Sequence, residues 1–255
     1  MSVTQSSWMV GNTHHLYAKI FQLDFWDALS AYVTDLFRLS LRWGHHPEPS
    51  KRAAIVAVPK PDKDPSVPTN WRPISLLPCL GKGLERLIAR RMSFTAPNEN
   101  VIHPQQFGAL PKRCTTDLAA CLIHDIERNW AKGLTTTMVT LDIQGAFDAV
   151  LPGQLQCHLR KQGWSAALMK WVNSFMNGRK GHIWLASHRT PDRHLSCGVP
   201  QGSPVSPILF MLFLQPLFDS RRKFGYADDV AIIARAKTPE EATKAVEMDL
   251  RKMAD

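Results

Sequence analysis

The stretch FGYADDVAII (residues 224–233) places two adjacent aspartates inside an otherwise apolar run. Carboxylates are costly in such surroundings unless something pairs with them. In a regular strand Asp228 and Asp229 would face opposite sides, so both can serve one site only if the backbone turns there. The stretch therefore predicts a strand, a turn and a second strand. A solvated turn is the simplest interpretation of an isolated Asp–Asp pair, because Asp is a common turn residue.

A third carboxylate changes that interpretation. Asp142 ends the strand-like run TTMVTLDI (residues 136–143). Two close carboxylates raise each other's pKa unless a cation neutralises them, and Mg²⁺ prefers such hard oxygen ligands. Three carboxylates can hold two metal ions about 3.5–4 Å apart, the arrangement that polymerases use for phosphoryl transfer. Asp148, six residues further on, is interpreted as a helix N-terminal or structural aspartate rather than a ligand.

The stretch CGVPQGSPVSPILF (residues 197–210) has the composition of a ligand-binding loop. Gly198 and Gly202 allow the backbone to approach a ligand closely, and Gln201 between them can both donate and accept hydrogen bonds. A purely structural loop before a buried helix is an equally good interpretation of this stretch taken alone.

A basic loop lies in VPKPDKDPSVPTNWRPISLLP (residues 58–78), where Lys60, Lys63 and Arg72 surround a run of prolines and aspartates. Arg suits phosphate oxygens through its fork of donors, and Lys acts as a point charge. The alternative is a solvated basic face.

The composition agrees with a polyanionic partner. The chain of 255 residues is 44% hydrophobic, enough for one large domain or two lobes. Lys and Arg number 31 against 22 Asp and Glu, so the formal net charge is +9, which favours nucleic acid before an anionic membrane. The five cysteines form no C-x-x-C pair, which indicates free thiols in a reducing compartment and no zinc site. Without a signal peptide or an apolar run long enough to span a bilayer, the protein is expected to be soluble and intracellular, with no membrane partner.

The four stretches, in this order, resemble those of reverse transcriptases. YADD (residues 226–229) is similar to the catalytic loop of that family, LDIQGAFDAV (141–150) to its first carboxylate motif and GVPQGSPVSPILF (198–210) to the motif that follows. The segments NWRPISLLP (70–78) and HPQQFGALPKRCTTDLAACLIHDIE (103–127) resemble the non-LTR, LINE-type retrotransposon enzymes. The group II intron enzymes are the alternative branch.

The resemblance implies a role for each matching residue. Asp142, Asp228 and Asp229 would be catalytic carboxylates that bind two Mg²⁺ ions, for which Mn²⁺ can substitute. The incoming deoxynucleoside triphosphate would meet Lys60, Arg72, Phe147, Gln201 and Gly202, with Phe147 excluding a 2′-OH. Tyr226 and Lys63 would contact the primer and template. The reaction implied is attack of a DNA primer 3′-OH on the α-phosphate, directed by an RNA template, in an intracellular and nuclear setting.

The fold implied is α+β, a right-hand polymerase. Residues 1–49 would form a helical lead-in, and residues 50–255 the fingers (about 50–130) and a palm (about 131–255) with a ferredoxin-like antiparallel sheet. The family continues with another palm strand carrying a lysine, a primer grip and a helical thumb, which have no counterpart here. We therefore expect a fragment with the thumb absent, which alone binds nucleic acid weakly and extends primers poorly.

Two other functions fit the same motifs. One is a catalytically inactive, nucleic-acid-binding remnant of such an element. The other is an RNA-directed RNA polymerase, which shares the paired aspartates of the palm. Phe147 argues against the second, because RNA synthesis needs room for the 2′-OH.

Overall fold

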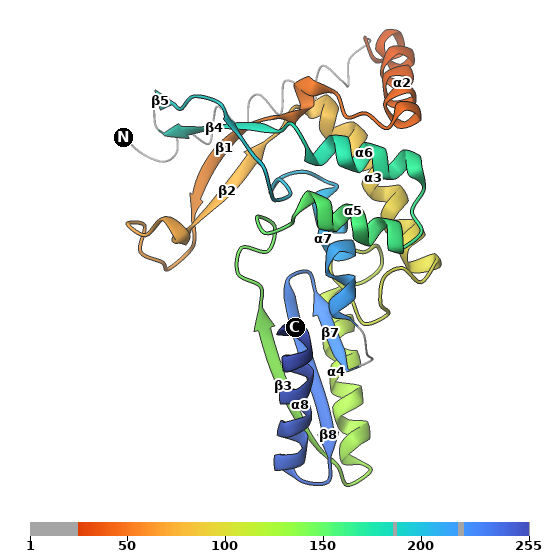
Figure 1. The fold of residues 1–255 in the computed structure, drawn as a ribbon, viewed down its shortest axis with the longest axis vertical. Coiled ribbons are helices and arrows are strands. Elements are labelled where there is room, and N and C mark those ends of the chain that lie inside the picture. The colour runs from red at the N-terminus through yellow and green to blue at the C-terminus, as the bar shows by residue number, and fades with distance from the viewer. Residues whose placement is uncertain (1–24, 186–187, 219–221, 255) are drawn as a thin grey trace.

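The structure, a computed structural model, describes residues 25–185, 188–218 and 222–254 and has a mixed α+β fold (Figure 1). The strands are β1 (Arg52–Pro59), β2 (Trp71–Leu76), β3 (Thr135–Asp142), β4 (Lys180–Leu185), β5 (His188–Arg189), β6 (Arg193–His194), β7 (Lys223–Tyr226) and β8 (Asp229–Ala236). The α-helices are α2 (Phe25–Trp43), α3 (Cys79–Asn98), α4 (Thr115–Trp130), α5 (Pro152–Lys161), α6 (Ala166–Met176), α7 (Ser206–Leu214) and α8 (Pro239–Ala254). Short 3₁₀ helices cover Glu48–Lys51, Pro68–Asn70 and Gln215–Leu217.

One sheet is built around the hairpin of β1 and β2, which pair antiparallel with Val58 opposite Arg72. The proline-rich segment between these strands is a loop, as its composition predicts. The other edge of β1 pairs with β4 in parallel, with Arg52 opposite Lys180, and β5 and β6 pair with β4. This sheet therefore combines residues from both of the ranges assigned above to fingers and palm.

The second sheet has the antiparallel order β3–β8–β7. The predicted strand, turn and strand are confirmed, since β7 ends at Tyr226 and β8 begins at Asp229. Helices α4 and α8 pack against this sheet. At the start of α8 the backbone amide of Glu241 donates to Thr238 Oγ1 (3.3 Å), which caps the helix.

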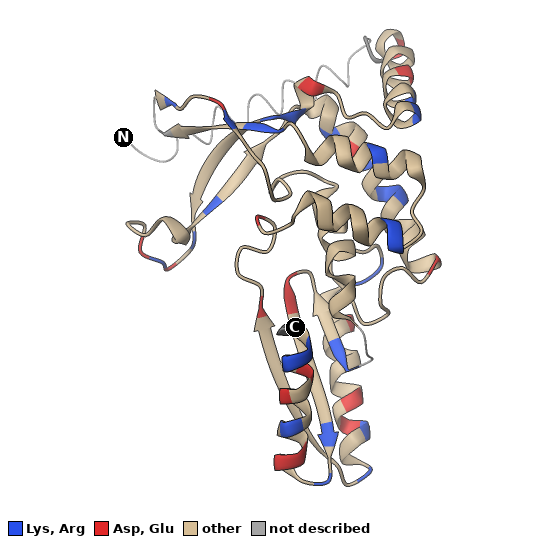
Figure 2. Cartoon of the chain, viewed as in Figure 1, with Lys and Arg blue, Asp and Glu red and all other residues tan. Residues whose placement is uncertain are grey.

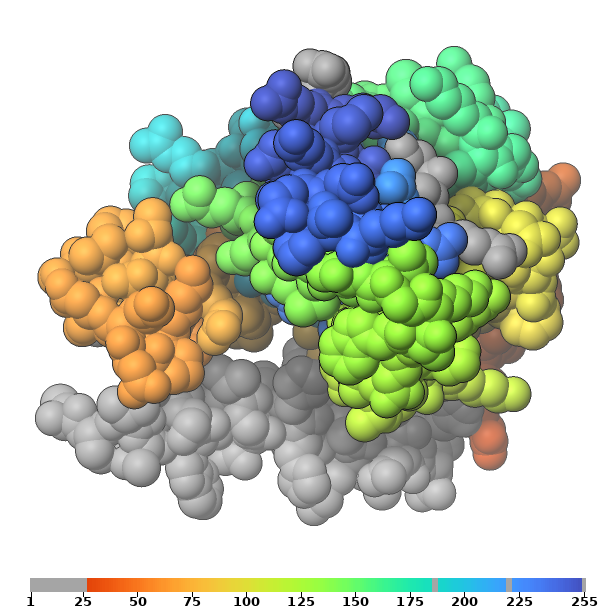
Figure 3. Space-filling model, turned by 90° about the horizontal axis from the view of Figure 1, so that it is seen from below, coloured from red at the N-terminus to blue at the C-terminus, as the bar shows by residue number. Residues whose placement is uncertain are grey.

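The core lies between the two sheets and is centred on α7. Most side chains of α7 (SPILFMLFL) are buried, on every side of the helix, because α3 and α5 pack against it. Trp171 and Phe175 of α6 stack at 5.4 Å within the same core. Seen from below, β1 and β2 form an orange lobe set to one side of the green and blue lobe of α4, β8 and α8 (Figure 3). None of the helices in the described residues is both long enough and apolar enough to cross a bilayer.

Candidate active site

A cleft of about 860 Å³ opens where the two sheets approach each other. It is bounded by β2, the segment after β3, the loop before α7 and the turn between β7 and β8. Figure 2 shows acidic positions at the end of β3 and in the neighbouring turn between β7 and β8. Most of the residues singled out in the sequence line this cleft: Lys60, Arg72, Asp142, Phe147, Gln201, Gly202 and Asp228. They come from four segments that are far apart in the chain.

The three predicted carboxylates lie at one end of the second sheet. Asp142 is the direct cross-strand partner of Asp229, and Asp228 lies in the adjoining turn and faces the cleft. Directly opposed residues have Cβ atoms about 4.5–5.5 Å apart, and like charges in such a pair repel. Within the described part of the chain, none of the three forms an ion pair with Lys, Arg or His, and no three Asp, Glu, His or Cys side chains lie close enough to form a ready-made metal site.

The turn that carries Asp228 is held by part of the segment HPQQFGALPKRCTTDLAACLIHDIE (103–127), to which the sequence assigned no role at the site. The amide of Phe107 donates to the carbonyl of Gly225 (2.8 Å), and the amide of Gly225 donates to the carbonyl of Gln105 (2.9 Å). Behind the turn, a Cβ added to Gly108 would lie 2.2 Å from the amide nitrogen of Ala227. Ala227 has φ +54°, a conformation that is uncommon for residues other than glycine. Gly108 within QQFGAL was the available signal, since a glycine can mark a close backbone approach.

We expect Gly108→Ala to destabilise the protein by about 1–3 kcal/mol, the usual cost of overpacking. The added methyl group would meet the backbone of Ala227, so the turn that carries Asp228 must shift. Urea unfolding measures the loss. Gly153→Ala is the matched control, because its Cβ would have no atom within 4 Å. Equal stability of the two variants would show that the turn is not tightly held.

Phe147 forms part of the cleft floor. Its ring stacks on buried Phe210 at a centroid distance of 5.1 Å, and its carbonyl accepts from the amide of Val199 (2.8 Å). The neighbouring Asp148 lies in a turn that ends before α5 begins, so the alternative of a helix N-terminal aspartate is wrong. The side chain of Asp148 is exposed at the cleft, yet partial burial of the carboxyl raises its pKa above the ordinary value.

The basic side of the cleft comes from the β1–β2 hairpin. Lys60 Nζ donates to the carbonyl of Thr69 (3.0 Å), which holds the side chain across the base of the loop. Arg72 on β2 is exposed and faces the cleft. Lys63 is exposed in the loop beyond the residues that line the cleft. Tyr226 also lies outside that lining and pairs with Asp229 on β8.

The segment of Gln201 and Gly202 is hydrogen-bonded to β2 and packs closely against it. The amide of Ser75 donates to the carbonyl of Gln201 (2.7 Å). Gly202 has φ +130°, and an added Cβ would lie 2.4 Å from the carbonyl oxygen of Ser75. Only glycine fits this approach without strain.

The chain matches one protein family over most of its length. Residues 58–255 match the family described as reverse transcriptase (RNA-dependent DNA polymerase). The chain belongs to the reverse transcriptase family. This reverse transcriptase domain is related to the polymerases of non-LTR retrotransposons. It is 32% identical to the RNA-directed DNA polymerase from mobile element jockey of Drosophila funebris, over 87% of this chain and 25% of that protein.

A second relative is the probable RNA-directed DNA polymerase from transposon X-element of Drosophila melanogaster, which is 29% identical over 85% of this chain and 24% of that protein. The reverse transcriptase domain thus spans about a quarter of the length of these curated relatives.

The fold of the reverse transcriptase domain is similar to solved telomerase structures. The telomerase of Candida tropicalis in complex with a fragment of telomeric RNA aligns with a TM-score of 0.56 at 11% identity, over 82% of this chain and 41% of that one. The apo enzyme truncated from its C-terminal domain aligns with a TM-score of 0.54 at 10% identity, over 79% of this chain and 46% of that one.

Proposed function

We propose that this chain is the fingers and palm part of an RNA-directed DNA polymerase from a non-LTR retrotransposon. The observation that carries the proposal is the pairing of Asp142 with Asp229 across two strands, together with the place of Asp142 and Asp228 in the lining of a cleft whose other wall is basic. Opposed carboxylates without a cation are unfavourable, and a basic wall nearby suits a polyphosphate. The family membership supports the same proposal.

Mg²⁺ fits these residues by the chemistry of the donors. Carboxylate oxygens are its usual protein ligands, and in the described part of the chain no basic side chain forms an ion pair with Asp142, Asp228 or Asp229. These three would hold two ions, and Mn²⁺ would be accepted because it takes the same ligands. When bound, such ions lower the pKa of an attacking hydroxyl and neutralise phosphate charge.

The other residues of the cleft would position the reactants. Lys60 and Arg72 would bind the triphosphate of the deoxynucleotide, and Gln201 with Gly202 would line the nucleotide and the template. Phe147 would exclude ribose. Tyr226 would lie by the primer end, and Lys63 would meet the primer–template duplex. The primer 3′-OH would attack the α-phosphate and pyrophosphate would leave. Much of the rate acceleration would come from orientation of the reactants and stabilisation of charge. The reaction would take place inside the cell, in the nucleus.

Addition of one nucleotide under enzyme excess tests the proposal. A labelled DNA primer on an RNA template is mixed with the chain, one complementary deoxynucleotide and Mg²⁺ or Mn²⁺. We expect slow, template-directed addition that depends on the metal. Primer–template binding without any addition would instead indicate an inactive, nucleic-acid-binding remnant.

Binding to an RNA–DNA duplex should depend strongly on salt and little on sequence. The net charge of +9 favours contacts to phosphates, and A-form duplexes are recognised mainly by shape and backbone. We expect affinity to fall at least about tenfold between 50 and 200 mM salt, the loss for two or more phosphate contacts. Fluorescence anisotropy with two duplexes of unrelated sequence measures both effects. Affinity that is independent of salt would contradict the expectation.

A further inference from the structure

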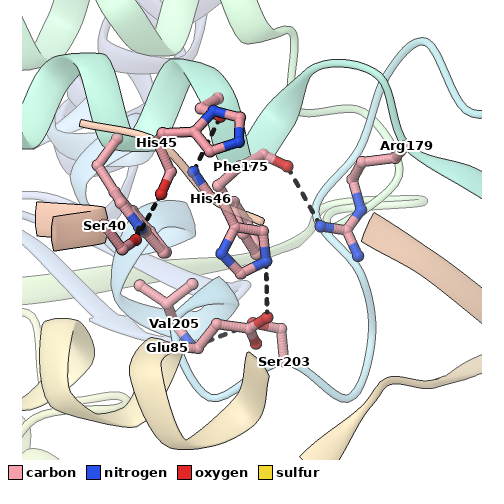
Figure 4. A network of polar contacts seen from close by, with 10 residues as sticks. Ser40, His45, His46, Glu85, Phe175, Arg179, Ser203 and Val205 are labelled. Atoms are coloured by element: carbon pink, nitrogen blue, oxygen red, sulfur yellow. Dashed lines mark hydrogen bonds and ion pairs between the residues drawn. The ribbon is translucent and has the colours of Figure 1, made fainter. Parts of the chain in front are cut away.

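A carboxylate is buried beneath the loop that carries Gln201 and Gly202. Glu85 of α3 is fully buried and accepts a 2.6 Å hydrogen bond from Ser203 Oγ (Figure 4). Ser203 directly follows Gly202 and also lines the cleft. The hydroxyl of Ser203 in turn accepts from the amide of Val205 (3.2 Å). The side chain of Glu85 in α3 therefore restrains the loop through Ser203.

Two basic groups accompany the buried Glu85. His46 Nε2 lies 3.4 Å from Glu85 Oε1, and both side chains are fully buried. Arg179 is also buried; desolvation lowers its pKa, and attraction to Glu85 opposes this shift. Arg179 donates to the carbonyl of Phe175 (3.2 Å) and lies over its ring. Both basic groups lie against Phe175 of α6, so Glu85 stands between the cleft loop and this helix.

Stability alone does not explain why these polar groups are buried together, because their burial costs free energy. Burying polar groups costs free energy unless hydrogen bonds satisfy them, and well-packed apolar residues of similar volume are often as stable or more stable. Among the described residues, Glu85 Oε1 and both ring nitrogens of His46 form no hydrogen bond. Within the described ranges, the hydrogen-bond partner of the Glu85 side chain is Ser203, which points to control of the loop as its role.

We propose that Glu85 is a positioning residue that acts through Ser203 to set the Gln201–Gly202 segment against the incoming nucleotide. The Gln201–Gly202 segment is then held by the backbone of β2 at Ser75 and by Glu85 at Ser203, in addition to the hydrogen bond of Val199 to Phe147 at the start of the loop. The effect on nucleotide binding rests on the proposed function, whereas the effect on the loop does not.

Two substitutions at Glu85 separate the acceptor from the bulk of the side chain. Glu85→Met keeps the length and removes both oxygens, while Glu85→Gln keeps one acceptor for Ser203. Ser203→Ala removes the same bond from the other side and serves if Glu85→Met does not fold. Met92→Ala is the control for lost stability, because Met92 is buried in the same helix and lines a different cavity.

Hydrogen–deuterium exchange of residues 199–205, measured without substrate, reports the loop. We expect faster exchange in Glu85→Met and Ser203→Ala, and exchange close to the wild type in Glu85→Gln and Met92→Ala. Single-nucleotide addition reports the consequence: KM for the deoxynucleotide should rise about tenfold in Glu85→Met, with a smaller change in kcat, as expected when binding that is equal in the ground and transition states is lost.

Unchanged exchange in Glu85→Met, or equal loosening in Met92→Ala, would overturn the inference. So would a loosened loop with an unchanged KM in an active chain. If the wild type adds no nucleotide, the proposed function fails, and the exchange comparison still decides whether Glu85 positions the loop.

Discussion

Asp228→Asn should abolish most nucleotide addition, with a rate at least about a hundredfold lower, in the range for loss of one group that stabilises transition-state charge. Asn keeps the shape of the side chain and removes the charge that would bind metal. Asp142→Asn should have the same effect, because Asp142 and Asp228 line the same cleft. Pre-steady-state addition of one deoxynucleotide measures the rates, and circular dichroism checks that the fold is kept.

The matched control is Asp148→Asn. Asp148 lies in the same cleft, six residues after Asp142, but we interpret it as structural. The Asp148→Asn variant should keep activity within a few-fold of the wild type. If Asp148→Asn is as inactive as Asp228→Asn, general loss of negative charge explains the result, and the assignment of three specific ligands is wrong. Full activity in Asp228→Asn would contradict the proposal that Asp228 binds metal.

Phe147→Val should raise the efficiency of ribonucleotide addition relative to deoxynucleotide addition about tenfold to a hundredfold, because one apolar contact discriminates by about 1–3 kcal/mol. The ring of Phe147 borders the cleft and rests on Phe210, so a smaller side chain opens space at this wall. Competition between matched ribo- and deoxynucleoside triphosphates on one template measures the ratio of kcat/KM values.

Phe210→Leu separates sugar selection from packing. Phe210 is buried behind Phe147 and does not line the cleft. This variant should lose stability, since it removes a stacked aromatic pair worth about 0.5–1.5 kcal/mol beyond its buried area, and should keep the preference for deoxynucleotides. A ratio unchanged in Phe147→Val would mean that Phe147 serves only the core.

The local elements around the cleft could be predicted from the sequence. Two adjacent aspartates inside an apolar run predicted the hairpin of β7 and β8, and a run of prolines and aspartates predicted the loop between β1 and β2. Such patterns work because apolar runs and turn residues act on the local backbone. The motif order also led to the family, which the match over residues 58–255 confirms. The roles of the individual site residues remain predictions.

Only the tertiary structure decided which elements meet. Nothing in the strand patterns indicated that β4 would pair in parallel with β1, or that Gly108 would lie against the turn before Asp228. Glu85 sits in a helix that the sequence presents as basic and amphipathic, and its complete burial under Ser203 depends on a residue 118 positions away. The physical reason is that periodicity specifies a buried face but not its partner. The partner follows from packing summed over the whole core, in which polar groups are buried only where distant residues satisfy them.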